Sequence, residues 1–208
     1  MNRVLTVLFF TVFSFLASEN SPVIANSPLV EGGRLPVINL PVPQNPDDRL
    51  YLGISGMGNF RIHQIKAEAV IIQIVNQYCP PCQTAVDEMV ELYRRIESNP
   101  GLHGKMKLIG IGAGNSSREV EVLREAHHLP FPIFPDEDFI IHKALGEVRT
   151  PYTIAVRIGP GSAYKVVYSQ PGGFTDTDRF LKLMLTTCGF KKDDSSGEKG
   201  DFEASLAQ

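Results

Sequence analysis

The sequence has no tryptophan, only three cysteines and no excess of positive charge. Its 20 Lys and Arg residues against 23 Asp and Glu give a net charge of -3, so it lacks the basic surface that binds nucleic acid. Three cysteines close at most one disulfide, which excludes a small domain held together mainly by disulfides. With 208 residues, 43% of them hydrophobic, the chain can bury a core in one domain or at most two small ones.

The beginning of the chain lacks charge over a hydrophobic run. Arg3 precedes the uncharged residues 4–17, a stretch shorter than the ~20 residues that a membrane-spanning helix needs. A basic start, a short hydrophobic run and small residues after it are typical of a secretory signal, so we predict a signal peptide over residues 1–25. A cut nearer Ala17, an uncleaved membrane anchor and a buried core helix are the alternatives. No cysteine precedes Cys79, which excludes a lipid-modified N-terminal cysteine. We therefore expect a periplasmic or otherwise extracytoplasmic protein, in a compartment that permits disulfide chemistry.

Two other segments differ in composition from the chain between them. Residues 26–59 are interrupted by prolines, which remove backbone donors and fix φ, so long helices and central strands are not expected there. We predict an extended arm that lies over the domain, with a short edge strand at 35–40. The polar residues 191–208 predict a disordered tail. The folded domain is then expected at residues 60–190.

Hydrophobic periodicity in this domain alternates between strand and helix patterns. The nearly continuous hydrophobic run 69–75 predicts a strand covered on both faces. Ser116 and Glu119 are spaced as a capping box at the start of a helix. The whole pattern predicts an α/β fold, a mixed sheet with helices on both faces, whose last two strands form an antiparallel hairpin. The predicted strands are 69–75, 107–112, 152–158 and 163–169, and the predicted helices lie at 82–97, after Ser116, at 138–145 and around 180–185.

The residues that carry chemistry lie where the first buried strand meets its helix, at Cys79-Pro80-Pro81-Cys82. Free backbone N–H groups at a helix start stabilise a thiolate, so we expect Cys79 to be the nucleophile in disulfide exchange. Cys82, one turn later on the same face, can then attack the mixed disulfide. The two prolines suit the first helical turn, which does not need their missing N–H groups.

A Cys-x-x-Cys pair also occurs in zinc sites, haem attachment sites and structural disulfides. Zinc normally needs a second ligand pair, which neither Cys188 nor the scattered histidines supply, and haem attachment needs a histidine where Gln83 stands. A structural disulfide stays open as the alternative, although ligands usually bind at the strand end where this pair is expected. We expect Cys188 to be an inert, partly buried thiol. Solvated or capping roles are expected for His63, His103, His127, His128 and His142.

The sequence from about residue 58 to 187 resembles the thioredoxin fold. A strand, Cys-x-x-Cys and an amphipathic helix are followed by Thr150-Pro151, a hairpin and a terminal helix. The stretches 131–136 and 145–151 are similar to the extracytoplasmic TlpA and redoxin branch. The resemblance implies that Pro151 is a cis proline facing Cys79 and that Thr150 offers backbone hydrogen bonds to an extended substrate. Tyr78 stands at the position of the family's usual tryptophan and is expected to help bind substrate.

The sequence also departs from the families that it resembles. Gln73 stands where thioredoxins have a buried acid, and Ala85 stands where many TlpA-like reductases have a glutamate. Both residues that would accept the proton of Cys82 are therefore absent, and water or another carboxylate must do so. Peroxiredoxins carry a proline and a hydroxyl residue where this chain has Ile72 and Asn76, so peroxidase chemistry is poorly supported.

The leading hypothesis is an extracytoplasmic thiol–disulfide oxidoreductase that reduces protein disulfides without a cofactor or metal. TlpA-like resemblance implies protein thiol and disulfide substrates, recharging by a membrane-bound electron donor, and a role in cytochrome c or metalloprotein maturation. The alternative is a binding protein on a thioredoxin scaffold with a structural disulfide, whose partner surface would be the arm 26–59 and the insert near Asp138. A peroxiredoxin-like antioxidant is the weaker enzyme alternative. The sequence leaves the oligomeric state open.

Overall fold

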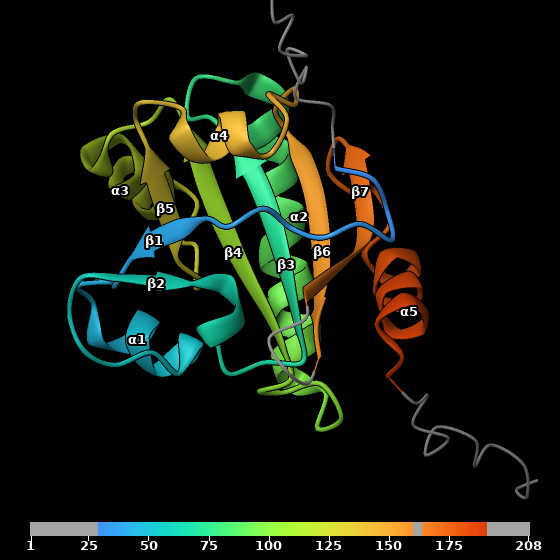
Figure 1. Ribbon diagram of the computed structural model, residues 1–208. Helices are drawn as coiled ribbons and strands as arrows, with labels where there is room; N and C mark the ends of the chain where they lie inside the picture. The colour runs from blue at the N-terminus through green and yellow to red at the C-terminus, as the bar shows by residue number, and fades with distance from the viewer. Residues whose placement is uncertain (1–28, 160–163, 191–208) are drawn as a thin grey trace, which may run out of the picture.

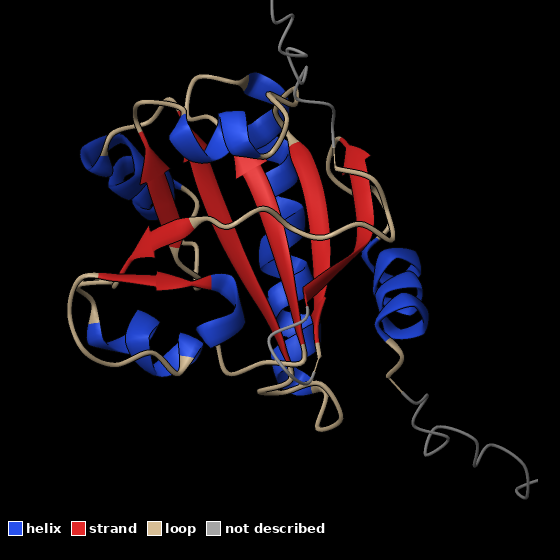
Figure 2. Cartoon of the chain, in the orientation of Figure 1, coloured by secondary structure: helices blue, strands red, loops and turns tan. Residues whose placement is uncertain are grey.

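The computed structural model describes residues 29–159 and 164–190, so the predicted signal 1–25 and the tail 191–208 lie outside the described residues. A mixed five-stranded sheet forms its centre, in the order β5-β4-β3-β6-β7 (Figures 1 and 2). β3, β4 and β5 are parallel, β6 is antiparallel to β3, and β7 is antiparallel to β6. The strands are β3 (Ala69–Val75), β4 (Met106–Ala113), β5 (Ile133–Asp136), β6 (Tyr152–Ile158) and β7 (Tyr164–Pro171).

Three amphipathic helices pack on one face of this sheet: α2 (Pro80–Ser98), α3 (Ser117–Ala126) and α5 (Thr177–Cys188). α2 is the longest of them and buries Val86, Met89 and Leu92 completely. With Ile96 they recur every three or four residues and so produce one hydrophobic stripe, which lies against the sheet. The three helices and the sheet side chains beneath them share one hydrophobic cluster.

The other face is covered by the segment from Leu35 to Ile65 and by the short helix α4 (Ile140–Ala144). In Figure 1 this segment crosses the sheet from the side of β7 toward β1 (Asn39–Pro41). Near its start, Gly32 and Gly33 exchange backbone hydrogen bonds of 2.8 and 2.9 Å with Val166 at the outer edge of β7. β1 then pairs antiparallel with β2 (Asn59–Arg61), which a 3-10 turn (Ile62–Gln64) follows.

The expectation of an extended arm is wrong for residues 46–52, which form helix α1 (Pro46–Leu52). The Asn45 side chain caps this helix by accepting from Asp47 N, Pro46 occupies its first turn, and Gly53 ends it with a left-handed φ of 65°. Leu40 and Leu52 are fully buried, so the segment is part of the core. The edge strand expected at 35–40 lies slightly later, as β1.

Most elements predicted within residues 60–190 are confirmed. The predicted strands 69–75 and 152–158 coincide with β3 and β6, and β6 and β7 form the expected hairpin. The capping box of α3 is present, with Ser116 and Glu119 each accepting from the backbone of the other. β5 was not predicted, because it is only four residues long and contains Pro135. The predicted mixed α/β fold with helices on both faces is observed.

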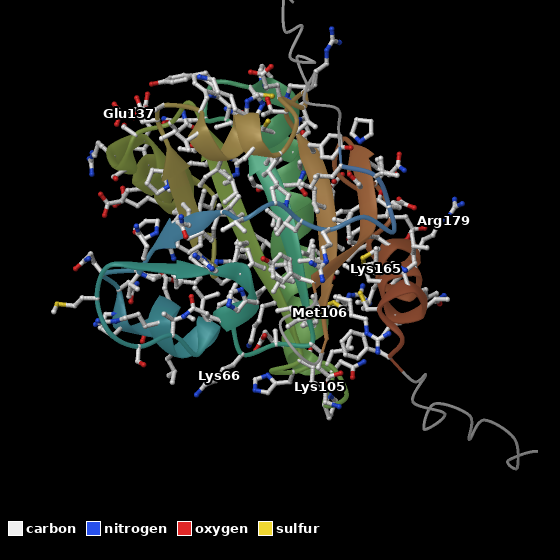
Figure 3. All side chains as sticks on the ribbon, viewed as in Figure 1. Lys66, Lys105, Met106, Glu137, Lys165 and Arg179 are labelled. Atoms are coloured by element: carbon white, nitrogen blue, oxygen red, sulfur yellow. The ribbon has the colours of Figure 1, made fainter. Side chains whose placement is uncertain are left out.

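The two ends of the sheet can be followed in Figure 3. Lys66 and Lys105 lie at the lower end, where β3 and β4 begin, whereas Glu137 lies at the upper end, just after β5. The carboxyl ends of β3 and β4, the start of α2 and the start of β6 therefore meet at the upper end, beneath α4 (Figure 1). Within residues 29–159 and 164–190, no helix has both the length and the hydrophobicity to cross a membrane.

Candidate active site

Cys79 lies at the start of α2, immediately after the turn that leaves β3. Its backbone N–H donates to Asn76 O at 3.1 Å, and its carbonyl accepts from Cys82 N at 2.9 Å. Pro80 and Pro81 form the first helical positions, where no N–H is needed. The first cysteine therefore sits at the N-cap of α2, as the sequence predicted. Because prolines fill the next two positions, the first N–H of the turn is that of Cys82, and it is bonded to the Cys79 carbonyl.

The two thiols of the pair lie in different surroundings. Burial would raise the pKa of Cys79, but hydrogen bonds from the Cys82 thiol, the Thr150 side chain and the Cys82 backbone outweigh it and leave that pKa below the usual thiol value. Cys82 is fully buried, and burial together with the neighbouring Cys79 raises its pKa to about 12. Cys79 is therefore the thiol that ionises first, and Cys82 keeps its proton at neutral pH.

Thr150 and Pro151 lie directly opposite Cys79. The peptide bond between them is cis, as predicted, and the Sγ of Cys79 lies 3.5 Å from the Thr150 carbonyl oxygen. Pro151 immediately precedes β6, which pairs with β3. Neighbouring strands thus bring residues 71 positions apart into contact. The substrate-binding role of Thr150, Pro151 and Tyr78 stays a prediction.

The end of β4 and the loop after it hold the segment that leads into Cys79. Asn76 donates to Ala113 O at 2.8 Å and accepts from Tyr78 N at 2.8 Å, while Gln77 N donates to Asn115 Oδ1 at 2.9 Å. The Tyr78 hydroxyl donates to Glu119 at the start of α3, with an O–O distance of 2.5 Å. The backbone and the ring before the nucleophile are therefore anchored separately.

A pocket of about 250 Å³ opens beside Cys79. Its far wall comes from α4 and the loop after it. The Phe139 ring packs directly on Gly114, and His142 contacts that ring edge to face, with the ring centres 5.6 Å apart. His142 Nε2 lies 2.8 Å from the Val148 carbonyl, so this nitrogen carries a proton and donates it. Residues lining the pocket include Tyr78, Cys79, Phe139, His142, Val148 and Thr150.

The sequence did not predict this wall. Asp136 places it, because its two carboxylate oxygens accept from the backbone N–H groups of Ile141 and His142 at 2.9 and 2.7 Å. An acid before a short helical pattern is a weak signal of such a cap. Nothing in the local sequence shows that the capped helix turns toward Cys79.

The sheet below α2 carries a glutamine at the position where thioredoxins have a buried acid. Gln73 is fully buried between Ile71 and Val75 on the face that packs against α2. Thr153 Oγ1 donates toward Gln73 Oε1, with a separation of 2.9 Å, and Gln73 Nε2 lies 3.4 Å from Gly172 O. An amide held in this way gains no proton near neutral pH, so Gln73 is not a base for Cys82.

Glu88 is a carboxylate that sequence reasoning overlooked. It lies on α2 and accepts from Phe174 N at 2.9 Å, and burial raises its pKa despite that hydrogen bond. A side chain at Gly173 would collide with both Ala85 and the Glu88 carboxylate, so Glu88 reaches the space that Ala85 leaves open. Glu88 lies on α2 about one turn beyond Ala85, and no sequence motif marks it.

The remaining candidate residues lie elsewhere in the fold. Cys188 is buried at the end of α5, where burial raises its pKa to about 11, consistent with an unreactive thiol. His103 and His127 pair at the surface with Glu97 and Asp87, each at 2.8 Å. Over the part of the chain that the structure describes, no cluster of three or more His, Cys, Asp or Glu could hold a metal ion.

Comparison with known proteins identifies the family. Residues 46–159, more than half of the chain, match the AhpC/TSA family, and the chain therefore belongs to it. The match begins at α1 and ends just after β6.

Individual relatives agree with this assignment. The chain is 22% identical over 128 residues to the thiol-disulfide oxidoreductase ResA of Halalkalibacterium halodurans, covering 61% of this chain and 68% of that protein. A candidate thiol:disulfide interchange protein DsbE from Chlorobium tepidum superposes with a TM-score of 0.57 at 13% identity, covering 77% of this chain and 99% of that chain. StoA from Bacillus subtilis gives a TM-score of 0.52 at 16% identity, covering 72% and 97%. The fold is thus thioredoxin-like, and the ResA and DsbE relatives carry names from thiol–disulfide exchange.

Proposed function

We propose that the protein is an extracytoplasmic thiol–disulfide oxidoreductase that reduces protein disulfides through Cys79 and Cys82. The observation that carries the proposal is the asymmetry of the pair. A partly exposed thiol of lowered pKa faces the Thr150 carbonyl, and a fully buried thiol of raised pKa lies one turn behind it. This arrangement supplies one nucleophile to solvent and keeps the second in reserve.

The geometry supports two exchange steps. The Cys79 thiolate attacks one sulfur of the substrate disulfide, forming a mixed disulfide and breaking the substrate S–S bond; the departing sulfur takes up a proton. Cys82 then loses its proton and attacks Cys79 Sγ, which forms the Cys79–Cys82 disulfide and releases the second substrate thiol. Two electrons pass from the pair to the substrate, which leaves as a dithiol.

The second step needs an acceptor for the Cys82 proton. We propose Glu88, whose carboxylate lies beside Gly173 together with the Ala85 methyl group, as this acceptor, and its raised pKa suits proton uptake. Once Cys79 is in the mixed disulfide, it carries no negative charge and no longer raises the pKa of Cys82. Loss of that proton therefore becomes easier at the point where it is required.

The reducing direction and the location rest on different support. The resemblance of residues 131–136 and 145–151 to the TlpA branch favours a reductant, and the signal-like residues 1–25 favour export from the cytoplasm. A reductant in that compartment needs electrons, so we propose a membrane-bound dithiol donor that converts the Cys79–Cys82 disulfide back to two thiols. Cytochrome c or another metalloprotein precursor is the proposed class of substrate.

The test uses the chain from residue 26 onward. Wild-type protein should reduce insulin disulfides with dithiothreitol as donor, and Cys82→Ala should accumulate a mixed disulfide through Cys79 that reductant releases. A pair that dithiothreitol cannot cycle, or trapping seen only in Cys79→Ala, would contradict the proposal. Hydrogen peroxide consumption, measured in parallel, tests the peroxidase alternative. At the position where peroxiredoxins have a hydroxyl residue, this chain has Asn76, whose side-chain amide is already bonded to the backbone.

The binding-protein alternative makes the opposite prediction for the cysteines. The variant Cys79→Ser/Cys82→Ser would keep partner binding and cellular function if the pair were only structural. Loss of function in that variant, with an unchanged melting temperature, supports the enzyme.

A further inference from the structure

Tyr78 combines high exposure with a fixed position. Its side chain is 69% exposed and lines the pocket beside Cys79. A tyrosine this exposed ordinarily samples several rotamers, and ordering it when substrate binds has an entropic cost. Here the hydroxyl is already bonded to Glu119, so the far end of the ring is held before substrate arrives.

The acceptor is itself rigidly placed. Glu119 lies in the first turn of α3, where its Oε2 accepts from the backbone N and the hydroxyl of Ser116 at 2.7 and 2.8 Å. Its other oxygen, Oε1, is left for Tyr78. The Glu119 carboxylate thus links the start of α3 to the Tyr78 ring.

The backbone of Tyr78 does not depend on this bond. Its N–H donates to Asn76, and the neighbouring Gln77 N donates to Asn115. Removing the Tyr78–Glu119 bond therefore frees the ring while the turn that presents Cys79 keeps its anchors. A role in positioning is therefore distinguishable from a role in folding in Tyr78→Phe, which leaves the Ser116–Glu119 capping box intact, whereas Glu119→Ala also removes that cap of α3.

The pocket that the ring borders has a neutral, largely hydrophobic lining. Phe139 and Val148 face it together with Tyr78, and the described residues that line it include no Asp, Glu, Lys or Arg. Phe139 is held by packing on Gly114, so one aromatic wall is fixed by contact and the other by a hydrogen bond. A volume of about 250 Å³ is sufficient for one side chain of the residue next to a substrate cysteine.

We infer that Glu119 is a positioning residue, which holds the Tyr78 ring as a wall for a hydrophobic side chain beside the substrate's cysteine. The inference rests on the proposed function and deepens it, because it names a recognition element of the disulfide substrate. Tyr78 also lowers the pKa of Glu119 through this hydrogen bond, so the carboxylate remains ionised and accepting at neutral pH.

Two synthetic peptides provide the probe. Each contains one disulfide, and the reactive cysteine is preceded by Phe in one and by Asp in the other. Wild-type protein should have the lower KM for the Phe peptide. Glu119→Ala should raise that KM about two- to tenfold, with a smaller change in kcat, because the ring must then be ordered on binding.

A double-variant cycle links the effect to the hydrogen bond. Tyr78→Phe keeps the ring and removes the hydroxyl, so it should raise the same KM, and Tyr78→Phe/Glu119→Ala should raise it no further than either single change. The matched control is Glu121→Ala, which removes an acid from α3 that pairs with the exposed Arg118 outside this pocket. It should leave both KM values unchanged.

A readout without substrate keeps the outcomes separate. In NMR spectra of protein with ¹³C-labelled tyrosine, the Tyr78 ring should be ordered in the wild type and mobile in Glu119→Ala. The control Glu121→Ala should have the melting profile of the wild type. Reduction of both peptides with no change in KM in Glu119→Ala would overturn the positioning role and leave the proposed function standing. If the wild type reduces neither peptide, the proposed function fails. Independently of activity, a Tyr78 ring that is equally ordered in the wild type and in Glu119→Ala overturns the positioning role.

Discussion

The two faces of the central sheet are built by different means. One is covered by α2, α3 and α5, whose hydrophobic stripes repeat every three to four residues. The other is covered by a proline-rich segment with one strand pair and two short helices. Both faces bury side chains completely, for example Met89 on the first and Leu40 on the second. Regular periodicity is therefore one route to a sealed core, and irregular backbone with its own caps is another.

The difference extends into the candidate site. The helical face contributes both cysteines, and the irregular face contributes the pocket wall of Phe139 and His142. We therefore expect chemistry to depend on the first face, and the part of recognition that uses the Phe139 wall to depend on the second.

The largest effect separates chemistry from recognition. Cys79→Ser should abolish insulin reduction, because the weaker serine nucleophile cannot form the mixed disulfide. Phe139→Ala should retain turnover and lose only about fivefold in kcat/KM, the effect of removing one hydrophobic contact. Steady-state kinetics on both variants provides the measurement. Complete loss of activity in folded Phe139→Ala would show that the division is wrong.

Core truncations compare the faces directly. Met89→Ala and Leu40→Ala should each lower the free energy of unfolding by about 2–5 kcal/mol, because both side chains are fully buried. Urea denaturation followed by circular dichroism measures both. A cost below about 1 kcal/mol for Leu40→Ala would mean that the irregular face is a detachable cover.

A smaller effect concerns the connection between the faces. Asp48 of α1 and Arg124 of α3 form a bidentate ion pair at 2.8 and 2.9 Å, and Asp48 is almost fully buried. Arg124→Ala should lower the free energy of unfolding by about 1–3 kcal/mol, because it leaves a buried carboxylate unpaired.

The matched control for this pair is Arg118→Ala. Arg118 belongs to the same helix but forms an exposed pair with Glu121, so its removal should change stability by less than about 0.5 kcal/mol. Equal effects of the two arginine variants would show that the Asp48 pair contributes nothing specific.

The smallest expected effect is a shift of the Cys79 alkylation profile to lower pH. The pKa of Cys79 is lowered, so its thiolate forms at lower pH than that of an ordinary thiol, and its alkylation rate should level off at correspondingly lower pH. Cys82 has a pKa near 12 and is buried, so it should remain unlabelled at neutral pH. Iodoacetamide rates followed by mass spectrometry give the profile. A Cys79 midpoint at or above that of a free thiol would contradict the assignment of the nucleophile.

Short-range patterns carried most of the correct sequence predictions. The hydrophobic run 69–75 defines β3, the Ser116–Glu119 spacing defines the start of α3, and the Cys-x-x-Cys pair defines the start of α2. Each depends on residues within one or two helical turns, or within one strand. Such patterns need no knowledge of the fold around them.

The failures depend on contacts between distant residues. α1 is only seven residues long, and burial of Leu52 together with the Asp48–Arg124 pair supports it from outside. Tyr78 meets Glu119 across 41 positions, and α4 reaches the Cys79 pocket only through the packing of the whole sheet. Tertiary placement determines these features, so local pattern cannot predict them.

The course of residues 29–34 affects how the protein behaves at high concentration. An exposed outer strand offers unpaired N–H and C=O groups to other chains and so promotes aggregation. At β7 the groups of Val166 are already bonded to Gly32 and Gly33, and at β5 Pro135 interrupts the row of N–H donors. Both borders of the sheet are thereby poor templates for pairing with a neighbouring molecule, which favours a protein that stays dispersed when it is concentrated.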